Sequence, residues 1–188
     1  MSLDKISAQL AGSKKSLPPV ESWNPPYCGE IDIQIKANGD WYYNGTIFKR
    51  LALVKMFASV LIKDVSKDVS DDLSKNMAEY FLVTPVEKVK IQVDDAPFVL
   101  TLWRWLDEKE TVMQVTTNLG DEFTLDKQHP LIVNESGDLY VTVRRNLTAK
   151  VHRNVYYQWA AIAKEQQTKN GTELIITSAK CQFTLGSY

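Results

Sequence analysis

Few residues of this chain are of the types that perform catalysis at neutral pH. The sequence contains two histidines, His129 and His152, and two cysteines, Cys28 and Cys181. Cys28 with either histidine would form a nucleophile–base pair only if the two side chains came within about 3 Å of each other. No local motif indicates such a pair, so structural roles are favoured for these residues and no catalytic residue is assigned.

Signatures of metal and nucleotide sites are equally sparse. The chain has no CxxC or HxxxH pair, and its histidines and cysteines are too few for a zinc shell. Asp94, Asp95, Glu30 and Asp32 could offer a carboxylate site for Mg²⁺, but the spacing of an EF-hand is absent. Neither GxxxxGK[ST] nor GxGxxG occurs. We therefore expect no metal and no cofactor, and a nucleotide would have to be held by arginines and aromatic rings.

Arginines at the ends of expected elements are candidate ligands for an anion. Arg50 and Arg153 stand at the heads of two expected helices, where free backbone N–H groups favour negative charge. Arg104 lies within the run LTLWRWL, and Arg144 lies in VRRN. Ion pairs with acids at the edge of the core are the alternative for Arg50 and Arg153. For Arg104 the alternative is a paired or snorkelling side chain on a strand that is covered on both faces.

One acidic residue falls where the pattern expects an apolar one. Residues 86–93 read VEKVKIQV and predict a strand. Glu87 shares a face with Val89 and Ile91, whereas Lys88 belongs to the outer face. A buried carboxylate without a partner costs several kcal/mol, so Glu87 should be paired, hydrogen-bonded or at an opening.

Hydrophobic periodicity and turn signals predict the elements that position these residues. Helices are expected at residues 3–10, at 51–61 and at 155–167, the last with Asn154 as its cap. Residues 30–50 predict an antiparallel meander with turns at Asn38-Gly39 and Asn44-Gly45. Further strands are expected at residues 81–83, 86–93, 97–106, 111–118, 131–134, 139–145, 147–152, 173–178 and 180–186. Residues 64–78 form a polar excursion that is either helix or loop.

The chain also shows an internal echo. Residues 33–42 lie over residues 131–140, and residues 79–91 lie over residues 173–185. Arg50 and Arg153 correspond at the heads of the two helices. The order of hairpin, helix and strand pair therefore occurs twice, which predicts a duplication and a cleft between two similar units.

Composition excludes several classes of function. The 188 residues are 44% hydrophobic and 24% charged, with a net charge of -1, which is ordinary for a globular protein. This charge gives no overall field for nucleic acid or an anionic membrane. No window approaches the roughly 18 apolar residues of a membrane span. Asp4 and Lys5 near the start, together with two cysteines, indicate a cytoplasmic protein with reduced thiols.

Four segments together resemble the bacterial domain-of-unknown-function family 1285: PPVESWNPPYCGEIDI, GDWYYNGTIFKRLALVKMF, YFLVTPVEKVKIQVDDAPF, and HPLIV through VHRNVYY. The likeness runs from Pro18 onward, with TPVEKVKIQVDDAPF its most specific part and residues 64–78 an insertion. The resemblance implies two related α+β units, the second distantly similar to pleckstrin-homology-like folds. It also implies a site between the units for a nucleotide-like molecule, and a signalling role. The family supplies no catalytic residues to carry over.

We therefore predict an α+β protein that arose by internal duplication. Residues 1–18 form a helix and linker, and residues 19–97 and 98–188 form two units, each a mainly antiparallel sheet with a packed helix. The expected function is non-enzymatic binding of a small anionic or nucleotide-like ligand at the junction of the units. The candidate ligand-binding residues are Arg50, Glu87, Lys88, Arg104, Arg144 and Arg153.

Two other functions stay open. One is a carboxylate- or metal-assisted hydrolase, which would need two of Glu87, Asp94 and Asp95 to converge in one cleft. The other is a protein-interaction module, which would present an exposed apolar patch. Partners such as nucleic acid and membrane are not expected, and the sequence does not indicate an oligomeric state.

Overall fold

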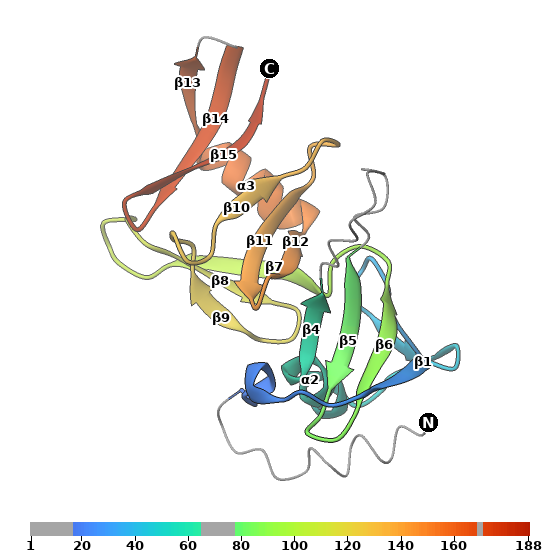
Figure 1. Ribbon diagram of the computed structural model, residues 1–188. Coiled ribbons are helices and arrows are strands. Elements are labelled where there is room, and N and C mark those ends of the chain that lie inside the picture. Colours follow the sequence, from blue (N-terminus) through green and yellow to red (C-terminus); the bar gives the residue numbers. More distant parts are fainter. Residues whose placement is uncertain (1–16, 65–77, 169–170) are drawn as a thin grey trace, which may run out of the picture. The chain divides into compact units, whose positions relative to one another are not determined.

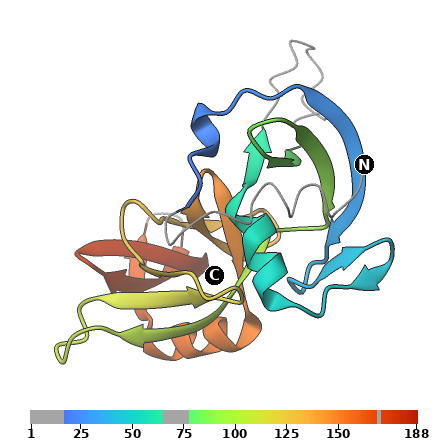
Figure 2. The same ribbon diagram turned by 90° about the horizontal axis from the view of Figure 1, so that it is seen from below.

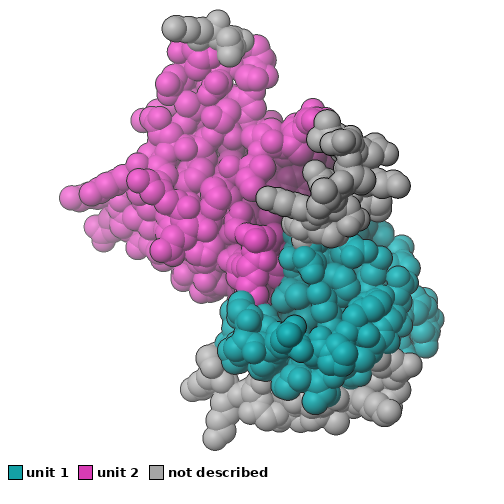
Figure 3. All heavy atoms as spheres, in the orientation of Figure 1, with its two compact units in different colours: residues 1–95 teal, residues 96–188 magenta. Residues whose placement is uncertain are grey.

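The structure is a computed structural model that describes residues 17–64, 78–168 and 171–188. The expected N-terminal helix lies outside these residues, as does nearly all of the polar excursion. The chain divides into two compact units, Met1–Asp95 and Ala96–Tyr188, which are coloured separately in Figure 3. Within the described part of the chain, none of the helices has the length and apolar character needed to cross a bilayer.

In its described residues, unit 1 is built on one six-stranded sheet with one α-helix (Figure 1). Its elements are a short 3₁₀ helix η1 (Val20–Ser22), β1 (Tyr27–Ile35), β2 (Trp41–Tyr43), β3 (Thr46–Ile47), α2 (Leu51–Ser59), β4 (Leu61–Asp64), β5 (Glu79–Val83) and β6 (Lys88–Val93). The strand order is β3-β2-β1-β6-β5-β4, and all neighbours are antiparallel except β1 and β6, which are parallel.

The sequence pattern explains the core of unit 1. Ile33 and Ile35 alternate with polar residues along β1 and are fully buried. Val54, Phe57 and Ala58 form the buried stripe of α2. Figure 2 shows β1 as a long, bent strand, in keeping with the two register shifts in its pairing with β6, between Tyr27 and Glu30 and between Glu30 and Gln34.

Unit 2 contains two sheets and one helix. Its elements are β7 (Phe98–Trp105), β8 (Met113–Thr117), β9 (Glu122–Thr124), β10 (Leu131–Val133), β11 (Leu139–Arg144), β12 (Leu147–Val151), α3 (Arg153–Ile162), β13 (Lys164–Thr168), β14 (Gly171–Ser178) and β15 (Cys181–Ser187). The first sheet has the order β10-β11-β12-β7-β8-β9, with β12 and β7 parallel, and the second has the order β13-β14-β15.

The six-stranded sheets of the two units repeat one topology. In each, two three-stranded meanders are joined by a parallel pair between the first strand and the sixth, β1 with β6 and β7 with β12. The units are therefore similar, each a mostly antiparallel sheet with a little helix. The strand correspondence differs from the echo read in the sequence, because β1 matches β7 and not β10. The helices are not equivalent either, since α2 precedes the fourth strand of its sheet and α3 follows the sixth.

The expectation that β7 is covered on both faces is wrong for its second half. Strand β12 pairs only with Phe98, Val99 and Leu100, and a register shift against β8 follows at once. After this register shift the side chain of Leu102 is 64% exposed. The bulge keeps the tryptophans that follow on the face of Leu100, and it leaves Leu102 facing solvent.

The end of the chain differs from the expected helix. Helix α3 begins at Arg153 with His152, not Asn154, as its cap, because the ring Nδ1 of His152 accepts the N–H of Asn154 at 3.2 Å. The helix ends at Ile162, and residues 164–168 form β13 instead of further helical turns. Antiparallel pairing with β14 outweighs the helix propensity of the KEQQ run. A short strand, β9, was also missed within residues 119–130.

Candidate functional site

The predicted site residues divide equally between the units. Arg50, Glu87 and Lys88 belong to unit 1, and Arg104, Arg144 and Arg153 belong to unit 2. The expected site at the junction of the units stays a prediction, so each group of residues is considered within its own unit.

Glu87 lies in the turn before β6 and not within the strand, which begins at Lys88. Its backbone N–H donates to the Thr84 hydroxyl at 3.1 Å, and its carbonyl accepts the Thr84 N–H at 2.9 Å. The Oε1 atom of Glu87 is buried and has no hydrogen-bond partner among the described residues. The sequence predicted that this carboxylate would be paired, hydrogen-bonded or at an opening, and its Oε1 atom receives no hydrogen bond from the described residues.

The two other candidates of unit 1 have different surroundings. Arg50 is the N-cap residue of α2 and its side chain is exposed. Lys88 extends over the ring of Phe81, with Nζ 4.1 Å from the ring centroid, and pairs with Asp64 at 3.0 Å. The positive charge of Lys88 on β6 is thus already balanced by a carboxylate on β4 of the same sheet.

Two arginines of unit 2 are occupied by protein groups. The Nε of Arg104 donates to the side-chain oxygen of Gln114 at 2.7 Å on the exposed side of β7 and β8. The guanidinium of Arg144 lies 4.7 Å from the centroid of the Phe98 ring and donates to a carboxylate oxygen of Asp121 at 2.8 Å. These contacts give Arg104 and Arg144 structural roles.

Arg153 is the candidate that lines a cavity. The cavity has a volume of about 500 Å³ and lies within unit 2, at the start of α3. It is lined by Gly137, Asp138, Leu139, Lys150, Val151, Arg153, Tyr156 and Tyr157. The side chain of Arg153 is exposed and makes no hydrogen bond or ion pair with the residues that the structure describes. Its charge is therefore available to a ligand.

The second cation of the cavity is partly neutralised. The Nζ of Lys150 lies 3.1 Å from a carboxylate oxygen of Asp138 and 5.8 Å from the centroid of the Tyr140 ring. Together Lys150, Asp138 and Arg153 leave the lining with one excess positive charge. The rings of Tyr156 and Tyr157 lie 5.8 Å apart at an angle of 58° and provide flat apolar surface beside this charge.

Local structure holds these groups in place. Asp138 lies in the turn between β10 and β11. Its backbone N–H donates a 2.8 Å hydrogen bond to the side-chain oxygen of Asn134. Gly137 provides the positive φ of 81° that the same turn requires. Lys150 is opposite Tyr140 in the β11–β12 pair, and the His152 cap starts α3 directly after β12. A turn, a strand end and a helix start thus converge on one cavity.

Sequence reasoning found Arg153 but missed the rest of this cavity. Lys150, Asp138 and the tyrosine pair were not singled out. The only local sign of this cavity in the sequence is the pair Tyr156-Tyr157, just after the expected start of the helix. Such a pair also fits the pattern of an ordinary amphipathic helix. The approach of Lys150 to Asp138 depends on the register of two strands, which a single sequence does not specify.

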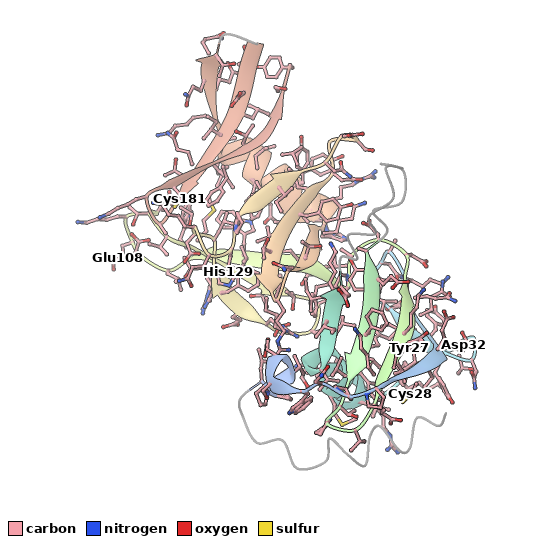
Figure 4. The ribbon with its side chains drawn as sticks, in the orientation of Figure 1. Tyr27, Cys28, Asp32, Glu108, His129 and Cys181 are labelled. Atoms are coloured by element: carbon pink, nitrogen blue, oxygen red, sulfur yellow. The ribbon has the colours of Figure 1, made fainter. Side chains whose placement is uncertain are left out.

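The two histidines contact neighbouring groups of the fold, and the two cysteines lie in different units as free thiols. His129 stacks on Phe123 with ring centroids 4.5 Å apart, and its Nδ1 lies 3.3 Å from Asp126. His152 caps α3. Figure 4 shows Cys28 on β1 of unit 1 and Cys181 at the start of β15 in unit 2. The thiol of Cys28 contacts the carbonyl oxygen of Pro26 at 3.4 Å.

Among the residues that the structure describes, carboxylates do not gather into a metal site. No group of three or more His, Cys, Asp or Glu side chains there could hold a metal ion. Asp94 accepts a hydrogen bond from Gln34 at 2.8 Å and lies 3.4 Å from Lys36. Asp94 therefore acts as a link between β1 and the end of β6.

Comparisons with known proteins place the chain among proteins of undetermined function. Residues 18–96 match the model described as "Domain of unknown function (DUF1285), N-terminal domain", and residues 97–185 match the model described as "Protein of unknown function (DUF1285), C-terminal domain". No curated protein matches the chain.

Two solved structures are similar to it. A DUF1285 family protein from Silicibacter pomeroyi DSS-3 is 30% identical, with a TM-score of 0.78 over 99% of this chain and 95% of that chain. A DUF1285 family protein from Shewanella baltica OS155 is also 30% identical, with a TM-score of 0.51 over 69% of this chain and 90% of that chain.

Proposed function

Since the chain belongs to the DUF1285 family, whose function is unknown, we propose a function from its own geometry: it is a non-enzymatic module that binds a small anionic, nucleotide-like ligand. The site is the cavity at the start of α3, within unit 2. The single observation that carries this proposal is the guanidinium of Arg153, which lines a cavity of about 500 Å³ and has no hydrogen-bond or ion-pair partner among the described residues.

The chemistry of the lining supports an anion. A guanidinium that has no protein partner can bind a phosphate or carboxylate through two parallel hydrogen bonds. Arg153 is also the first residue of a ten-residue helix, whose dipole favours negative charge at that end. Lys150 remains close enough to Asp138 to be shared between that carboxylate and a bound anion.

The tyrosines support a ligand with a planar part. Tyr157 lines the cavity and is 59% exposed, so its ring is accessible to a ligand. Stacking on such a ring would stabilise a nucleobase or a similar flat group. The volume falls within the range of about 300 to 1,000 Å³ that is usual for small-molecule sites.

Titration calorimetry with AMP, adenosine and citrate tests the proposal. We expect AMP to bind more tightly than adenosine, because only AMP carries the phosphate that pairs with Arg153. Arg153→Ala should weaken AMP binding by about tenfold, the loss expected for one charge-assisted contact. Tyr157→Ala should weaken AMP more than citrate, because citrate has no planar ring to stack.

Arg104→Ala is the matched control, because it removes an exposed arginine of the same unit that does not line the cavity. Equal binding of AMP by Arg153→Ala and the unsubstituted protein would contradict the proposal. So would the failure of all three compounds to bind.

A signalling role and a pleckstrin-homology-like fold of unit 2 belong to the same proposal. The order of elements, six strands in two meanders followed by a helix, supports the fold assignment. The signalling role rests on the family resemblance alone. Of the two alternative functions, the hydrolase has no observation in its favour. The interaction module is favoured only by separate exposed apolar side chains, such as Leu102 and Leu106.

A further inference from the structure

Strands β7, β8 and β9 of unit 2 are neighbours in one sheet, and their cross-strand pairs define what each face of it carries (Figure 1). On one face the pairs form two rows: Leu102, Thr116 and Glu122 in the first, and Arg104, Gln114 and Thr124 in the second. Leu106 follows Arg104 on the same side, because its N–H continues the ladder by donating to the carbonyl of Val112 at 2.8 Å. We call this surface the β7–β9 face.

The opposite face of these strands is covered by the fold. Met113 and Val115 are almost fully buried there. Trp103 lies on the same side, and its indole N–H donates to the side chain of Gln158 on helix α3 at 2.7 Å. On the β7–β9 face, in contrast, Leu102 is 64% exposed and Leu106 is 49% exposed. The sheet therefore packs with one side and leaves two large aliphatic side chains in water on the other.

The β7–β9 face also carries one charge of each sign. Arg104 and Glu122 are both exposed. Arg104 donates through Nε to Gln114, and neither Arg104 nor Glu122 makes an ion pair with any residue that the structure describes. They lie on β7 and β9, two strands apart, which separates their backbones by about 10 Å. The charges of this surface therefore cancel overall, although the two side chains do not meet.

We propose that the β7–β9 face is a contact surface for a second copy of this chain, with the two faces packed against each other around a two-fold axis. In a two-fold contact every pairing occurs twice, because a residue that meets a residue of the other copy is met in return. Arg104 of each copy then lies against Glu122 of the other, and the exposed leucines of both copies are covered. Sheets that pack face to face bury aliphatic side chains in this way.

A second copy fits this surface because the surface complements itself. A face with charges of one sign would repel its own copy, whereas one arginine and one glutamate on different strands can pair crosswise. The surface is small, spanning roughly 10 Å across the strands and 14 Å along them, whereas a stable interface buries roughly 800 Å² on each partner. The dimer is therefore weak and forms only at high protein concentration. None of its residues lines the cavity at Arg153, so the contact is independent of the proposed ligand site.

Sedimentation velocity over a concentration series up to millimolar protein, at low salt, tests the contact. We expect the average mass to rise from that of a monomer toward that of a dimer. Arg104→Glu alone and Glu122→Arg alone should each stay monomeric, because each substitution places like charges against each other twice in the dimer. Each should raise the dissociation constant by more than about tenfold.

Mixing the two charge variants gives the sharpest result. In a mixed dimer one contact joins the two introduced charges and the other joins the two native ones, and both contacts are between opposite charges. We therefore expect equal amounts of Arg104→Glu and Glu122→Arg to associate with each other, although neither associates with itself. A merely structural effect of either substitution would not be reversed by the other variant.

Matched controls separate this face from the rest of the surface. Leu102→Ala should raise the dissociation constant by about tenfold, because each dimer loses two buried leucine side chains. Leu51→Ala removes a leucine of α2 in unit 1 that is 52% exposed, and it should change nothing. Glu135→Arg reverses an exposed acid in the turn between β10 and β11 and should likewise leave the association unchanged.

Three results would overturn the proposal. One is a protein that stays monomeric throughout the concentration series. Another is a mixture of the two charge variants that associates no better than either variant alone. The last is an equal effect of Leu102→Ala and Leu51→Ala on the association. Circular dichroism should show every variant folded, because all of these substitutions are at exposed positions.

Discussion

The backbone N–H of Met113 donates a 2.9 Å hydrogen bond to the hydroxyl of Ser178, and both residues are buried. Met113 begins β8 in the six-stranded sheet of unit 2, whereas Ser178 ends β14 in its three-stranded sheet. A second bond runs the other way, from the N–H of Ala179 to the carbonyl of Thr111 at 2.9 Å. These two contacts join the two sheets of unit 2.

Ser178→Ala should therefore destabilise the protein, although the substitution removes only one oxygen atom. The substitution leaves the buried N–H of Met113 without its partner, and an unsatisfied buried donor costs about 1–3 kcal/mol. Urea unfolding should show a fall in the free energy of unfolding of that size. Ser187→Ala, at an exposed position near the end of β15, should change the free energy by less than about 0.5 kcal/mol. Equal effects of the two substitutions would contradict this role of Ser178.

The Asp107 carboxylate should make stability depend on pH. Hydrogen bonds from the Thr111 hydroxyl, and then from the backbone N–H groups of Thr111 and Val112, hold the pKa of Asp107 below its ordinary value of 3.8. A carboxyl with a lowered pKa in the folded state stabilises the fold above pH 3.8, and this contribution is lost as the pH falls through the lower folded value. Asp107→Asn should be less stable than the unsubstituted protein at neutral pH, and the difference should shrink below pH 3.8.

Thr111→Val checks the cause of this shift. It removes the hydroxyl donor that contributes most to it, so an NMR titration should show the pKa of Asp107 moving back toward its ordinary value. A pH-independent stability difference between Asp107→Asn and the unsubstituted protein would show that the charge of Asp107 has no part in stabilising the turn between β7 and β8.

Glu87→Gln should stabilise the protein slightly. The Oε1 atom of Glu87 is buried without a hydrogen-bond partner in the described structure, so at that atom the carboxylate loses hydration that no described group restores. An amide of the same shape is less costly to desolvate, and we expect the free energy of unfolding to rise by about 0.5–1 kcal/mol in urea.

Glu122→Gln on β9 is the control, because that side chain is exposed and the substitution should have almost no effect. A clear loss of stability in Glu87→Gln would contradict this account and would mean that the charge of Glu87 is stabilised by a partner, which is one of the possibilities that the sequence left open.

Local signals in the sequence were enough for much of the fold. The alternation around Ile33 and Ile35 predicted β1, and the stripe at Val54 and Phe57 predicted α2. The two Asn-Gly pairs predicted the turns from β1 to β2 and from β2 to β3. These features depend on neighbours in the chain. The family resemblance was confirmed as well, because it rested on long runs of sequence.

Features that depend on distant pairing could not be predicted in the same way. Residues 164–168 contain good helix formers, and only their pairing with β14 makes them a strand. The exposure of Leu102 follows from where β12 stops, and the approach of Lys150 to Asp138 follows from strand register. The cavity at Arg153 is therefore visible in the structure, although the sequence had indicated only one of its residues.

The turn between β14 and β15 should be improvable by substitution. Ala179 and Lys180 form a two-residue hairpin loop with φ values of 50° and 64°, a conformation that side chains other than Asn and Gly adopt at a cost. Ala179→Asn with Lys180→Gly should raise the free energy of unfolding by about 1 kcal/mol, measured in urea. The loop at Asn44 and Gly45 has the same geometry, with φ values of 47° and 71°, so Asn44→Ala with Gly45→Lys should lower it comparably. Effects of the same sign in both loops would contradict this account.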